Sequence, residues 1–493
     1  MRWSAASLIV LLTFAAAHAD EAPRDIADRR ELFVDGYLID SMSGVRMNLA
    51  EPRDEGPVVR FDQPWEGPFC GYCTVLHDAA APGGGKFMLY YRGKPERQSD
   101  GVGELTCLAE SNDGLRWTKP KLGLIEFDGS RENNLVLAVD GLSHNFSPLI
   151  DTKPGVAADE RFKAFCGTMA TGLVAMASPD GVRWRKLQDA PVIAKSDVPF
   201  PYMFDSQNVA FYSPVEQKYL AYFRVFKDGV RRICRAESDD FLHWTGVQLM
   251  EYRKLDGQPA PIEHLYTNQT HPYFRAPQLY VSICARFMPG RQVLDAEEAK
   301  AIHVDPNYFK DASDAIFMTT RGGNVYDRTM LSSFIRPGIG PQNWVSRTNY
   351  PALNVVQTGP HEMSVYVNQD YAQPTAHLRR YSLRLDGFAS LRAPYEGGEV
   401  VTRPLTFRGN RLLLNFATSA AGGIRVEVQN AAGEPIPGFT LNDSVETIGN
   451  EIERRVRWKE GADVGALAGK PVRLRFAMKD ADLFALRFAE EKP

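Results

Sequence analysis

Three carboxylates of this 493-residue chain stand immediately before apolar, strand-like runs. They are Glu66 in Q-P-W-E-G-P, Asp205 in F-D-S-Q-N-V-A-F-Y-S and Glu362 in H-E-M-S-V-Y-V. Carboxylates that meet around one sugar ring can cleave a glycosidic bond, because one protonates the leaving oxygen while another attacks or activates water. A third carboxylate can hold the pKa values of the other two apart. We therefore predict that Asp205, Glu362 and Glu66 are catalytic, with the acid, base or nucleophile, and pKa-tuning roles not assigned among them.

Other polar side chains flank strand-like runs in the same way and are predicted to bind the substrate. They are His144, Asn145, Asp151, Gln207, Asn208, Glu263, His271, Asp314 and His361. Each of them alone could instead cap a strand or make a turn. The prediction depends on such groups from several sheets lying together in one pocket. Aromatic partners for a sugar ring are at hand in Trp65, Tyr202 and Tyr266.

Three arginines occupy one position in three similar runs, L-Y-Y-R, A-Y-F-R and I-C-A-R, as Arg92, Arg224 and Arg286. They are also predicted to bind the substrate, because guanidinium groups recognise carboxylate or sulfate through paired hydrogen bonds. The alternative is structural: each arginine would pair with a neighbouring carboxylate and tie the sheets together.

A repeated heptapeptide marks the elements that must position these groups. Asp-Gly favours a tight turn, and the aromatic residue that closes each copy begins a strand. Clear copies are Ser111–Trp117, Ser178–Trp184 and Ser238–Trp244, and weaker ones are Thr320–Tyr326 and Arg384–Ser390. Five turns, each after a β-rich run, predict a five-bladed β-propeller. The alternative is a common turn that recurs by chance in a β protein.

In a propeller the inner strands all begin at one end of the channel, so the residues before them converge. The predicted inner strands are Gly71–His77, Phe146–Asp151, Asn208–Ser213, a run from Pro272, and Met363–Asn368. We expect Glu31–Asp40 to complete the last blade and close the ring. The long connection Phe287–Ser313 holds D-A-E-E-A-K-A-I, which predicts a short helix.

After about Val400 the sequence alternates apolar and polar residues at period two, which predicts an antiparallel β-sandwich. The length favours two domains. We therefore expect an all-β protein with a catalytic propeller at 25–399 and a sandwich at 400–493.

Composition narrows the function classes. A net charge of −4 gives no nucleic-acid footprint. The start of the chain, with Arg2, the apolar run Leu8–Ala17 and Ala17-His18-Ala19, predicts a signal peptide at 1–19 and export to periplasm or medium. No later segment is apolar enough for a membrane span.

The six cysteines are expected to be buried free thiols. The sequence predicts no cofactor, although a structural calcium ion in the channel is compatible with it. It does not determine the oligomeric state.

In these turns, in the stretch Asp205–Arg224 and in its two-domain order, the chain resembles the five-bladed propeller glycoside hydrolases of family 32 and the related family 43. The resemblance covers roughly residues 31–399 and extends to exported bacterial proteins with a family 32-like N-terminal domain. It implies a glycosidase with a C-terminal β-sandwich module. The sequence departs from three motifs of family 32. It has Q-P-W-E-G-P where the family has W-M-N-D-P-N-G, and Asp205-Ser206 where the family has E-C. The family motif R-D-P has no match in it. Fructofuranoside chemistry is therefore not implied.

The predicted function is hydrolysis of a glycosidic bond in an oligo- or polysaccharide, with an acidic or sulfated glycan as the expected class. Two alternatives stay open: a non-catalytic carbohydrate-binding propeller, and a glycoside phosphorylase that needs one carboxylate and a phosphate site. Loss of turnover with retained binding in carboxylate variants would favour the hydrolase, and phosphate-dependent turnover would favour the phosphorylase.

Overall fold

The repeated heptapeptide is a turn that its own side chains hold. In Ser178–Trp184, Asp180 Oδ1 accepts two backbone N–H bonds of 2.8 Å each, and Ser178 Oγ accepts the N–H of Gly181 at 2.9 Å. The same bonds recur in Ser111–Trp117 and Ser238–Trp244. The fourth position has φ of +76° in Ser178–Trp184, which glycine adopts without steric cost. The sequence therefore predicted this turn correctly from its Asp-Gly pair.

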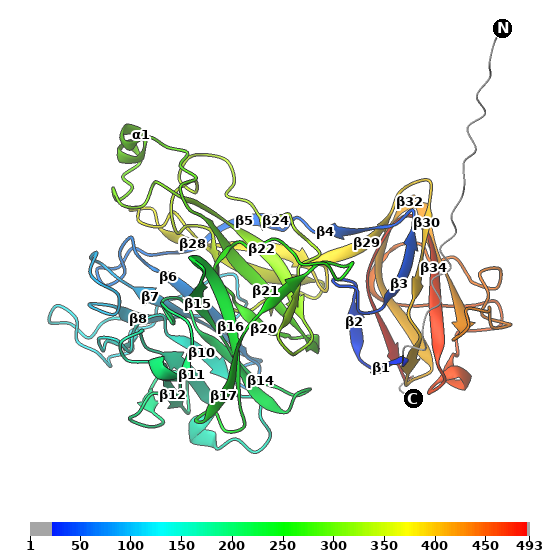
Figure 1. Cartoon of the computed structure of the whole chain (residues 1–493), viewed down its shortest axis with the longest axis horizontal. Coiled ribbons are helices and arrows are strands. Elements are labelled where there is room, and N and C mark those ends of the chain that lie inside the picture. Colours follow the sequence, from blue (N-terminus) through cyan, green and yellow to red (C-terminus); the bar gives the residue numbers. More distant parts are fainter. Residues whose placement is uncertain (1–21, 491–493) are drawn as a thin grey trace, which may run out of the picture.

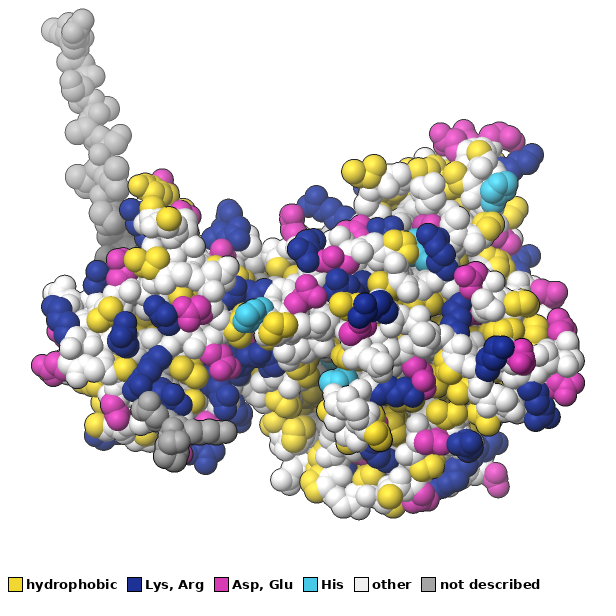
Figure 2. All heavy atoms as spheres, turned by 180° about the vertical axis from the view of Figure 1, so that it is seen from behind, with side chains coloured by type: hydrophobic (Ala, Val, Ile, Leu, Met, Phe, Trp, Pro, Cys, Tyr) yellow, Lys and Arg dark blue, Asp and Glu magenta, His cyan; other side chains and the backbone are white. Residues whose placement is uncertain are grey.

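Residues 22–490 are described by the computed structural model of the chain, and the predicted signal peptide at 1–19 lies outside them. The structure is all-β, with 48% strand and 3% helix, and forms a large and a small lobe (Figure 1). Charged side chains of both signs are interspersed over the face that Figure 2 shows. Within the described residues no helix is long and apolar enough to cross a membrane.

Five sheets build the large lobe in a propeller-like arrangement. The first three have four strands each: β6 (Gly71–Asp78), β7 (Lys86–Gly93), β8 (Leu105–Ser111) and β9 (Leu135–Leu137); β10 (Ser147–Ile150), β11 (Phe162–Cys166), β12 (Val174–Ser178) and β13 (Arg185–Lys186); β14 (Val209–Ser213), β15 (Lys218–Lys227), β16 (Val230–Ser238) and β17 (Trp244–Leu249).

The other two sheets are less regular. The fourth contains β18 (Glu251–Arg253), β19 (His264–Thr267), β20 (Thr270–Tyr273), β21 (Ala276–Met288), β22 (Ala312–Thr320), β23 (Val325–Asp327) and β24 (Ser333–Ile335). The fifth contains β25 (Tyr350–Pro351), β26 (Val356–Gln357), β27 (Glu362–Gln369), β28 (His377–Arg384) and β5 (Arg53–Arg60).

Contacts between the fifth sheet and the first close the ring. Thr74 of β6 and Leu353, between β25 and β26, form a parallel bridge. Tyr366 of β27 donates its hydroxyl to the carbonyl of Gly114, in the turn of the first sheet, at 2.5 Å. Tyr90 of β7 makes the same bond to Gly181 in the second sheet, at 2.7 Å. Each of these turns is therefore anchored by a tyrosine of the sheet before it.

Four blades are recognised in this arrangement, so the predicted count of five is not confirmed. The fifth sheet departs from regular blade form because its inner edge is broken into two strands of two residues each, β25 and β26. Its outer strand, β5, comes from the N-terminal side of the chain. An N-terminal strand thus completes this sheet, but it is Arg53–Arg60 and not the predicted Glu31–Asp40.

The small lobe contains one ten-stranded sheet, so the predicted two-sheet sandwich is not confirmed. Its long strands β32 (Arg411–Asn430) and β34 (Val472–Ala489) pair along most of their length and surround one apolar core. Residues from both ends of the predicted propeller range 25–399 also pair in this sheet, since 24–49 and 389–399 contribute strands to it. The remaining strands are β1 (Arg24–Ala27), β2 (Arg30–Leu32), β3 (Ile39–Ser43), β4 (Arg46–Leu49), β29 (Ala389–Ala393), β30 (Gly398–Thr402), β31 (Leu405–Phe407) and β33 (Asn450–Arg455).

The long connection of the fourth sheet projects from the large lobe and carries the helix α1 (Ala296–Ala301), as predicted (Figure 1). Asp295 caps α1 by accepting the N–H groups of Glu297 and Glu298 at 2.9 and 2.8 Å. Three short 3-10 helices complete the described structure, at Ala158–Glu160, Lys195–Asp197 and Gly465–Leu467. All six cysteines are buried and free, which confirms the prediction for them.

Candidate functional site

A pocket lies at the end of the channel where the innermost strands begin, and we call it the channel-mouth pocket. Segments beside the first, third, fourth and fifth sheets line it with four tyrosines, four cations and two carboxylates. The lining residues are Phe69, Tyr72, Arg92, Lys94, Arg97, Gln98, Asp100, Asp205, Tyr266, Tyr308, Arg347 and Tyr371. Loops that join second to third strands, including those after β7 and β21, reach this end, as the propeller geometry predicted.

Residues other than glycine with positive φ lie in or near the innermost strand of every sheet of the large lobe. Tyr72, Asn145, Phe204, Gln269 and Asn349 have φ of +51°, +50°, +67°, +52° and +59°. Positive φ is unfavourable for bulky side chains, and such conformations cluster where function requires them. Strained residues thus accompany the innermost strand of each sheet.

Asp205 is the carboxylate on the inner wall of the pocket. It precedes β14 and forms an ion pair with Arg224, near the end of β15. The Arg224 side chain is 2% exposed whereas the Asp205 side chain is 44% exposed. Arg224 also stacks 4.5 Å from the ring centre of Tyr266, and its Nε and Nη1 have no hydrogen-bond partner among the described residues. A buried cation thus orients an accessible carboxylate and retains two unused donors.

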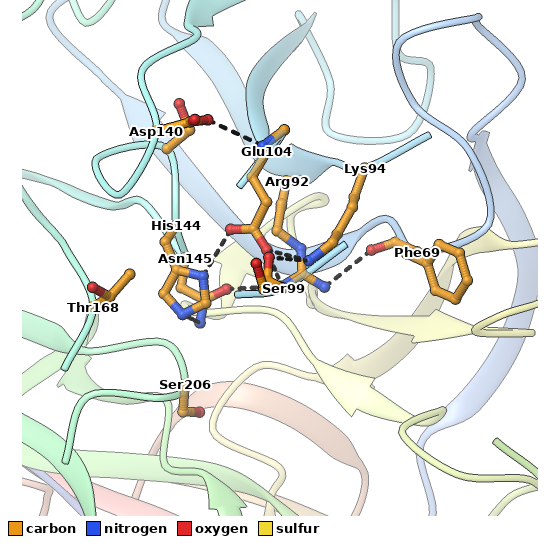
Figure 3. A network of polar contacts seen from close by, with 12 residues as sticks. Phe69, Arg92, Lys94, Ser99, Glu104, Asp140, His144, Asn145, Thr168 and Ser206 are labelled. Atoms are coloured by element: carbon orange, nitrogen blue, oxygen red, sulfur yellow. Dashed lines mark hydrogen bonds and ion pairs between the residues drawn. The ribbon is translucent and has the colours of Figure 1, made fainter. Parts of the chain in front are cut away.

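Glu104 anchors a buried network behind the pocket wall (Figure 3). It accepts from Arg92 Nη1 at 3.4 Å, from Lys94 Nζ at 2.8 Å and from His144 Nδ1 at 2.7 Å. Burial raises the pKa of Glu104, but the neighbouring Arg92, His144 and Lys94 outweigh it and hold that pKa well below its usual value. Glu104 therefore stays ionised and fixes Arg92 and Lys94, two of the four cations that line the pocket.

Asn145 completes this network and determines how His144 is protonated. Its Oδ1 accepts from Arg92 at 3.2 Å, and its amide nitrogen lies 3.0 Å from His144 Nε2. Since an amide N–H₂ only donates, His144 Nε2 accepts and Nδ1 carries the proton shared with Glu104. His144 and Asn145 thus position Arg92 and do not themselves line the pocket.

Arg347 is the cation of the pocket that lacks an acidic partner. Its guanidinium lies 5.0 Å from the ring centre of Tyr308 and 5.9 Å from that of Tyr266. Its Nη1 donates to the Tyr308 hydroxyl at 3.3 Å. Within residues 22–490 no carboxylate lies within ion-pair distance of Arg347. An arginine partly removed from water without a counter-ion favours an anionic ligand.

Glutamines close the channel below the pocket. Gln207 and Gln269 are fully buried, and Gln269 Nε2 donates to Gln207 Oε1 at 2.7 Å. Gln207 Nε2 continues to Thr74 Oγ1 at 2.6 Å, and Gln269 Nε2 to the carbonyl of Pro351 at 2.7 Å. Asn208 is buried beside them and bonds to backbone carbonyls of its own loop. The predicted residues Gln207 and Asn208 therefore belong to the floor of the channel.

Glu362 and His361 are not at this end of the channel, which corrects their prediction. Glu362 begins β27, whose far end pairs with β25 through Asn368 and Tyr350. β27 is thus the second strand of its sheet and runs opposite to an inner strand. Glu362 bonds instead to Arg380, and His361 lines a cleft between the lobes.

Glu66 and Asp151 are also away from the pocket. Glu66 is fully buried and bonds to the hydroxyl of Tyr91 at 2.5 Å and to Lys119 Nζ at 2.7 Å. Asp151 follows β10 at its opposite end and bonds to Lys163 Nζ and to the Tyr219 hydroxyl, both at 2.6 Å. Both carboxylates tie strands together, so the predicted roles in catalysis and binding do not fit their positions.

Arg286, Asp314 and Glu263 form a closed ion-pair cluster, as the structural alternative for the arginines foresaw. Arg286 bonds to both oxygens of Asp314, at 2.8 and 2.6 Å, and to Glu263 at 2.9 Å. His271 lies beyond the glutamines and bridges Gln269 O and the N–H of Val355. Burial lowers the pKa of His271 to about 4, so it is neutral at pH 7. None of these four predicted residues lines the pocket.

Asp205, Arg92 and Arg224 are the predicted residues that the structure brings together, and Tyr266 joins them as expected. Sequence reasoning missed Arg347, because it took β27 for the innermost strand and so overlooked the run before Tyr350. It also missed pocket residues on loops after second strands, where no periodic pattern identifies them: Lys94, Arg97, Asp100, Tyr308 and Tyr371.

The free volume of the pocket is about 30 Å³. That is roughly the space of one water molecule, whereas ligand pockets usually hold hundreds of cubic ångströms. The rim consists of the segment around Arg97, which faces Asp305 at 3.9 Å, and of Tyr308, whose ring lies 5.7 Å from Phe69. A sugar can therefore occupy the pocket only when these rim side chains move outward.

No protein-family model matches the chain, and no curated protein matches it in sequence. Among solved structures it is similar to an N-acetylgalactosamine deacetylase from F. plautii, with 13% identity, coverage of 69% of this chain and 96% of that chain, and a TM-score of 0.43. It is also similar to a Bombyx mori family 32 β-fructofuranosidase, with 11% identity, coverage of 88% and 95%, and a TM-score of 0.41. A third similar structure is a fructofuranosidase from Schwanniomyces occidentalis, with 11% identity, coverage of 90% of this chain and 99% of that chain, and a TM-score of 0.38. Identities and scores this low assign neither family nor activity.

Proposed function

We propose that the protein is a carbohydrate-active enzyme that binds an anionic glycan in the channel-mouth pocket and hydrolyses its glycosidic bond. The observation that carries the proposal is the charge of the pocket: Arg347 lacks an acidic partner, and buried Arg224 fixes Asp205 in the pocket wall. Carboxylate or sulfate groups supply the matching acceptors. The tyrosine walls supply flat apolar surfaces with polar ends, which suit a sugar ring.

Two carboxylates line the pocket and supply the groups that hydrolysis needs. Asp205 is ion-paired and accessible, so it serves as the nucleophile or as the base that activates water. Asp100, on the loop after β7, is exposed and serves as the proton donor to the leaving oxygen. In this reaction the glycosidic C–O bond breaks, the leaving oxygen gains a proton, and water supplies the new hydroxyl of the sugar. Asp100 thereby replaces Glu362 and Glu66 as the proposed partner of Asp205.

Phosphorolysis is a second candidate, and the same cation excess favours it. A phosphate ion bound by Arg347 would attack the sugar in place of water, so one carboxylate would suffice as acid. A non-catalytic glycan-binding propeller is the third outcome that an experiment must separate.

The test is incubation of the purified protein with sulfated and uronate-containing oligosaccharides and their neutral counterparts, with and without inorganic phosphate. Reducing ends and sugar phosphates are then measured, and binding is followed by calorimetry. Hydrolysis of an anionic substrate without phosphate supports the proposal. Sugar phosphate formed only with phosphate supports the second candidate, binding without cleavage supports the third, and exclusive action on neutral glycans contradicts the proposal.

Export also remains a proposal. Export is supported by the charged start, apolar run and small-residue cleavage motif of residues 1–19. Recovery of the native protein from periplasm or medium with Asp20 at its N-terminus would support it.

A further inference from the structure

The loop that carries Asp205 is strained at two bulky residues. Tyr202 and Phe204 have φ of +52° and +67°. Their peptides are held against the end of β15, because Phe226 N–H donates to Pro201 O at 3.0 Å and Phe204 N–H donates to Arg224 O at 3.1 Å. Phe204 is fully buried, so packing accounts for its conformation. Tyr202 is not buried, and packing does not account for it.

Tyr202 presents its ring to solvent. It is 63% exposed, although large aromatic side chains usually bury most of their surface. Its ring meets that of Phe226 at 5.5 Å and 64°, an edge-to-face contact that leaves a face of Tyr202 uncovered. The fixed backbone and the Phe226 contact together hold this face outward, on the loop that carries Asp205.

A continuous line of stacked groups joins Tyr202 to the pocket. Arg231 lies 5.0 Å from the ring centre of Phe226 and 4.9 Å from that of Tyr266. Tyr266 lines the pocket and lies under Arg224, the partner of Asp205. The line Tyr202–Phe226–Arg231–Tyr266 therefore leads from the surface of the third sheet to the reacting carboxylate.

We propose that Tyr202 is the stacking platform for a second sugar ring, adjacent to the ring held at Asp205. This inference rests on the proposed function and specifies it: the substrate is an oligosaccharide whose chain continues over the third sheet along Phe226 and Arg231. Tyr202 is a binding and positioning residue, and it takes no part in proton transfer.

The experiment compares binding of galacturonic acid, digalacturonate and trigalacturonate, and of sulfated carrageenan di- and tetrasaccharides, by calorimetry. The proteins are the wild type, Tyr202→Ala, Tyr202→Phe and a control, Tyr395→Ala, which removes a tyrosine of 60% exposure from the small lobe. We expect Tyr202→Ala to weaken binding of the longer glycans about tenfold, with little change for the monosaccharide. Tyr202→Phe keeps the ring and is expected to bind like the wild type, as is Tyr395→Ala.

The possible results distinguish failure of the Tyr202 platform from failure of the proposed function. If the wild type binds the longer glycans and Tyr202→Ala binds them equally well, the platform is wrong and the proposed function stands. If Tyr202→Ala weakens mono- and oligosaccharide equally, the loop acts on the pocket as a whole and the platform is again wrong. If the wild type binds none of these anionic glycans, the proposed function fails and the platform fails with it. Circular dichroism and melting temperature confirm that each variant is folded.

Discussion

Asp205 and Arg224 form the ion pair that faces the channel-mouth pocket, with side chains that are 44% and 2% exposed. The buried arginine is fixed by its position at the end of β15 and by stacking on Tyr266. The carboxylate is therefore held in one orientation while it stays open to a ligand.

Replacement of the carboxylate tests its role directly. Asp205→Asn keeps size and hydrogen bonding but removes the charge, so turnover should fall by about 10²- to 10⁴-fold. The affinity for an anionic glycan should remain, because the cations are untouched. Initial rates and calorimetry measure the two effects. Glu362→Gln is the matched control, since Glu362 lies at the end of β27 that is away from the channel-mouth pocket. Loss of activity in this control would contradict our assignment of the site.

Arg347 should recognise the anionic group of the ligand. Arg347→Gln removes the charge and is expected to weaken binding of an anionic glycan by roughly 10- to 100-fold, while a neutral analogue is little affected. Arg347→Lys should recover only part of the affinity, because an ammonium group lacks the planar fork of a guanidinium. Titration at rising salt concentration gives the readout: equal losses for charged and neutral sugars would show that Arg347 merely supports the pocket wall.

The rim of the pocket should limit access. Because about 30 Å³ is free, ligand binding requires Tyr308 to move away from Phe69 and Arg347. Tyr308→Ala is therefore expected to raise the association rate constant several-fold in stopped-flow experiments, and to raise the dissociation rate as well. An unchanged association rate would mean that ligands reach Asp205 by another route.

One partly buried acid, Asp327, predicts how stability depends on pH. Burial, with Asp35 nearby, raises the pKa of Asp327 from 3.8 to about 6. The folded protein then keeps a proton that the unfolded chain has lost, so this residue lowers stability as pH rises from about 4 to 6, by up to about 3 kcal/mol. Asp327→Asn should therefore raise the melting temperature at pH 7 to 8 and leave it unchanged near pH 4. Equal melting curves of variant and wild type at pH 8 would contradict this.

The repeat was readable from sequence because its information is local. Ser178, Asp180 and Gly181 make a turn by their own side chains and backbone freedom, whatever surrounds them. The first three sheets followed from it, whereas α1 followed from D-A-E-E-A-K-A-I in the long connection. The last sheet was misread because its inner edge, β25 and β26, has only two residues in each strand, too few to show a period.

The candidate site could be predicted only in part, for a related reason. Asp205 and Arg224 sit next to long strands, so their positions followed from the strands. Glu362 was wrongly placed in the site because β27 was taken for an innermost strand. Glu66 is excluded by its burial against Tyr91 and Lys119, which no local sequence pattern reveals. Arg347 and Tyr308 lie on irregular segments whose course depends on tertiary packing.

The most direct test of the central claim is a crystal structure of Asp205→Asn soaked with the anionic oligosaccharide that the wild type binds best. We predict density in the channel-mouth pocket, with a carboxylate or sulfate group within hydrogen-bond distance of Arg347 and a sugar ring beside residue 205. Density in the cleft between the lobes near His361, with the channel-mouth pocket empty, would contradict the account.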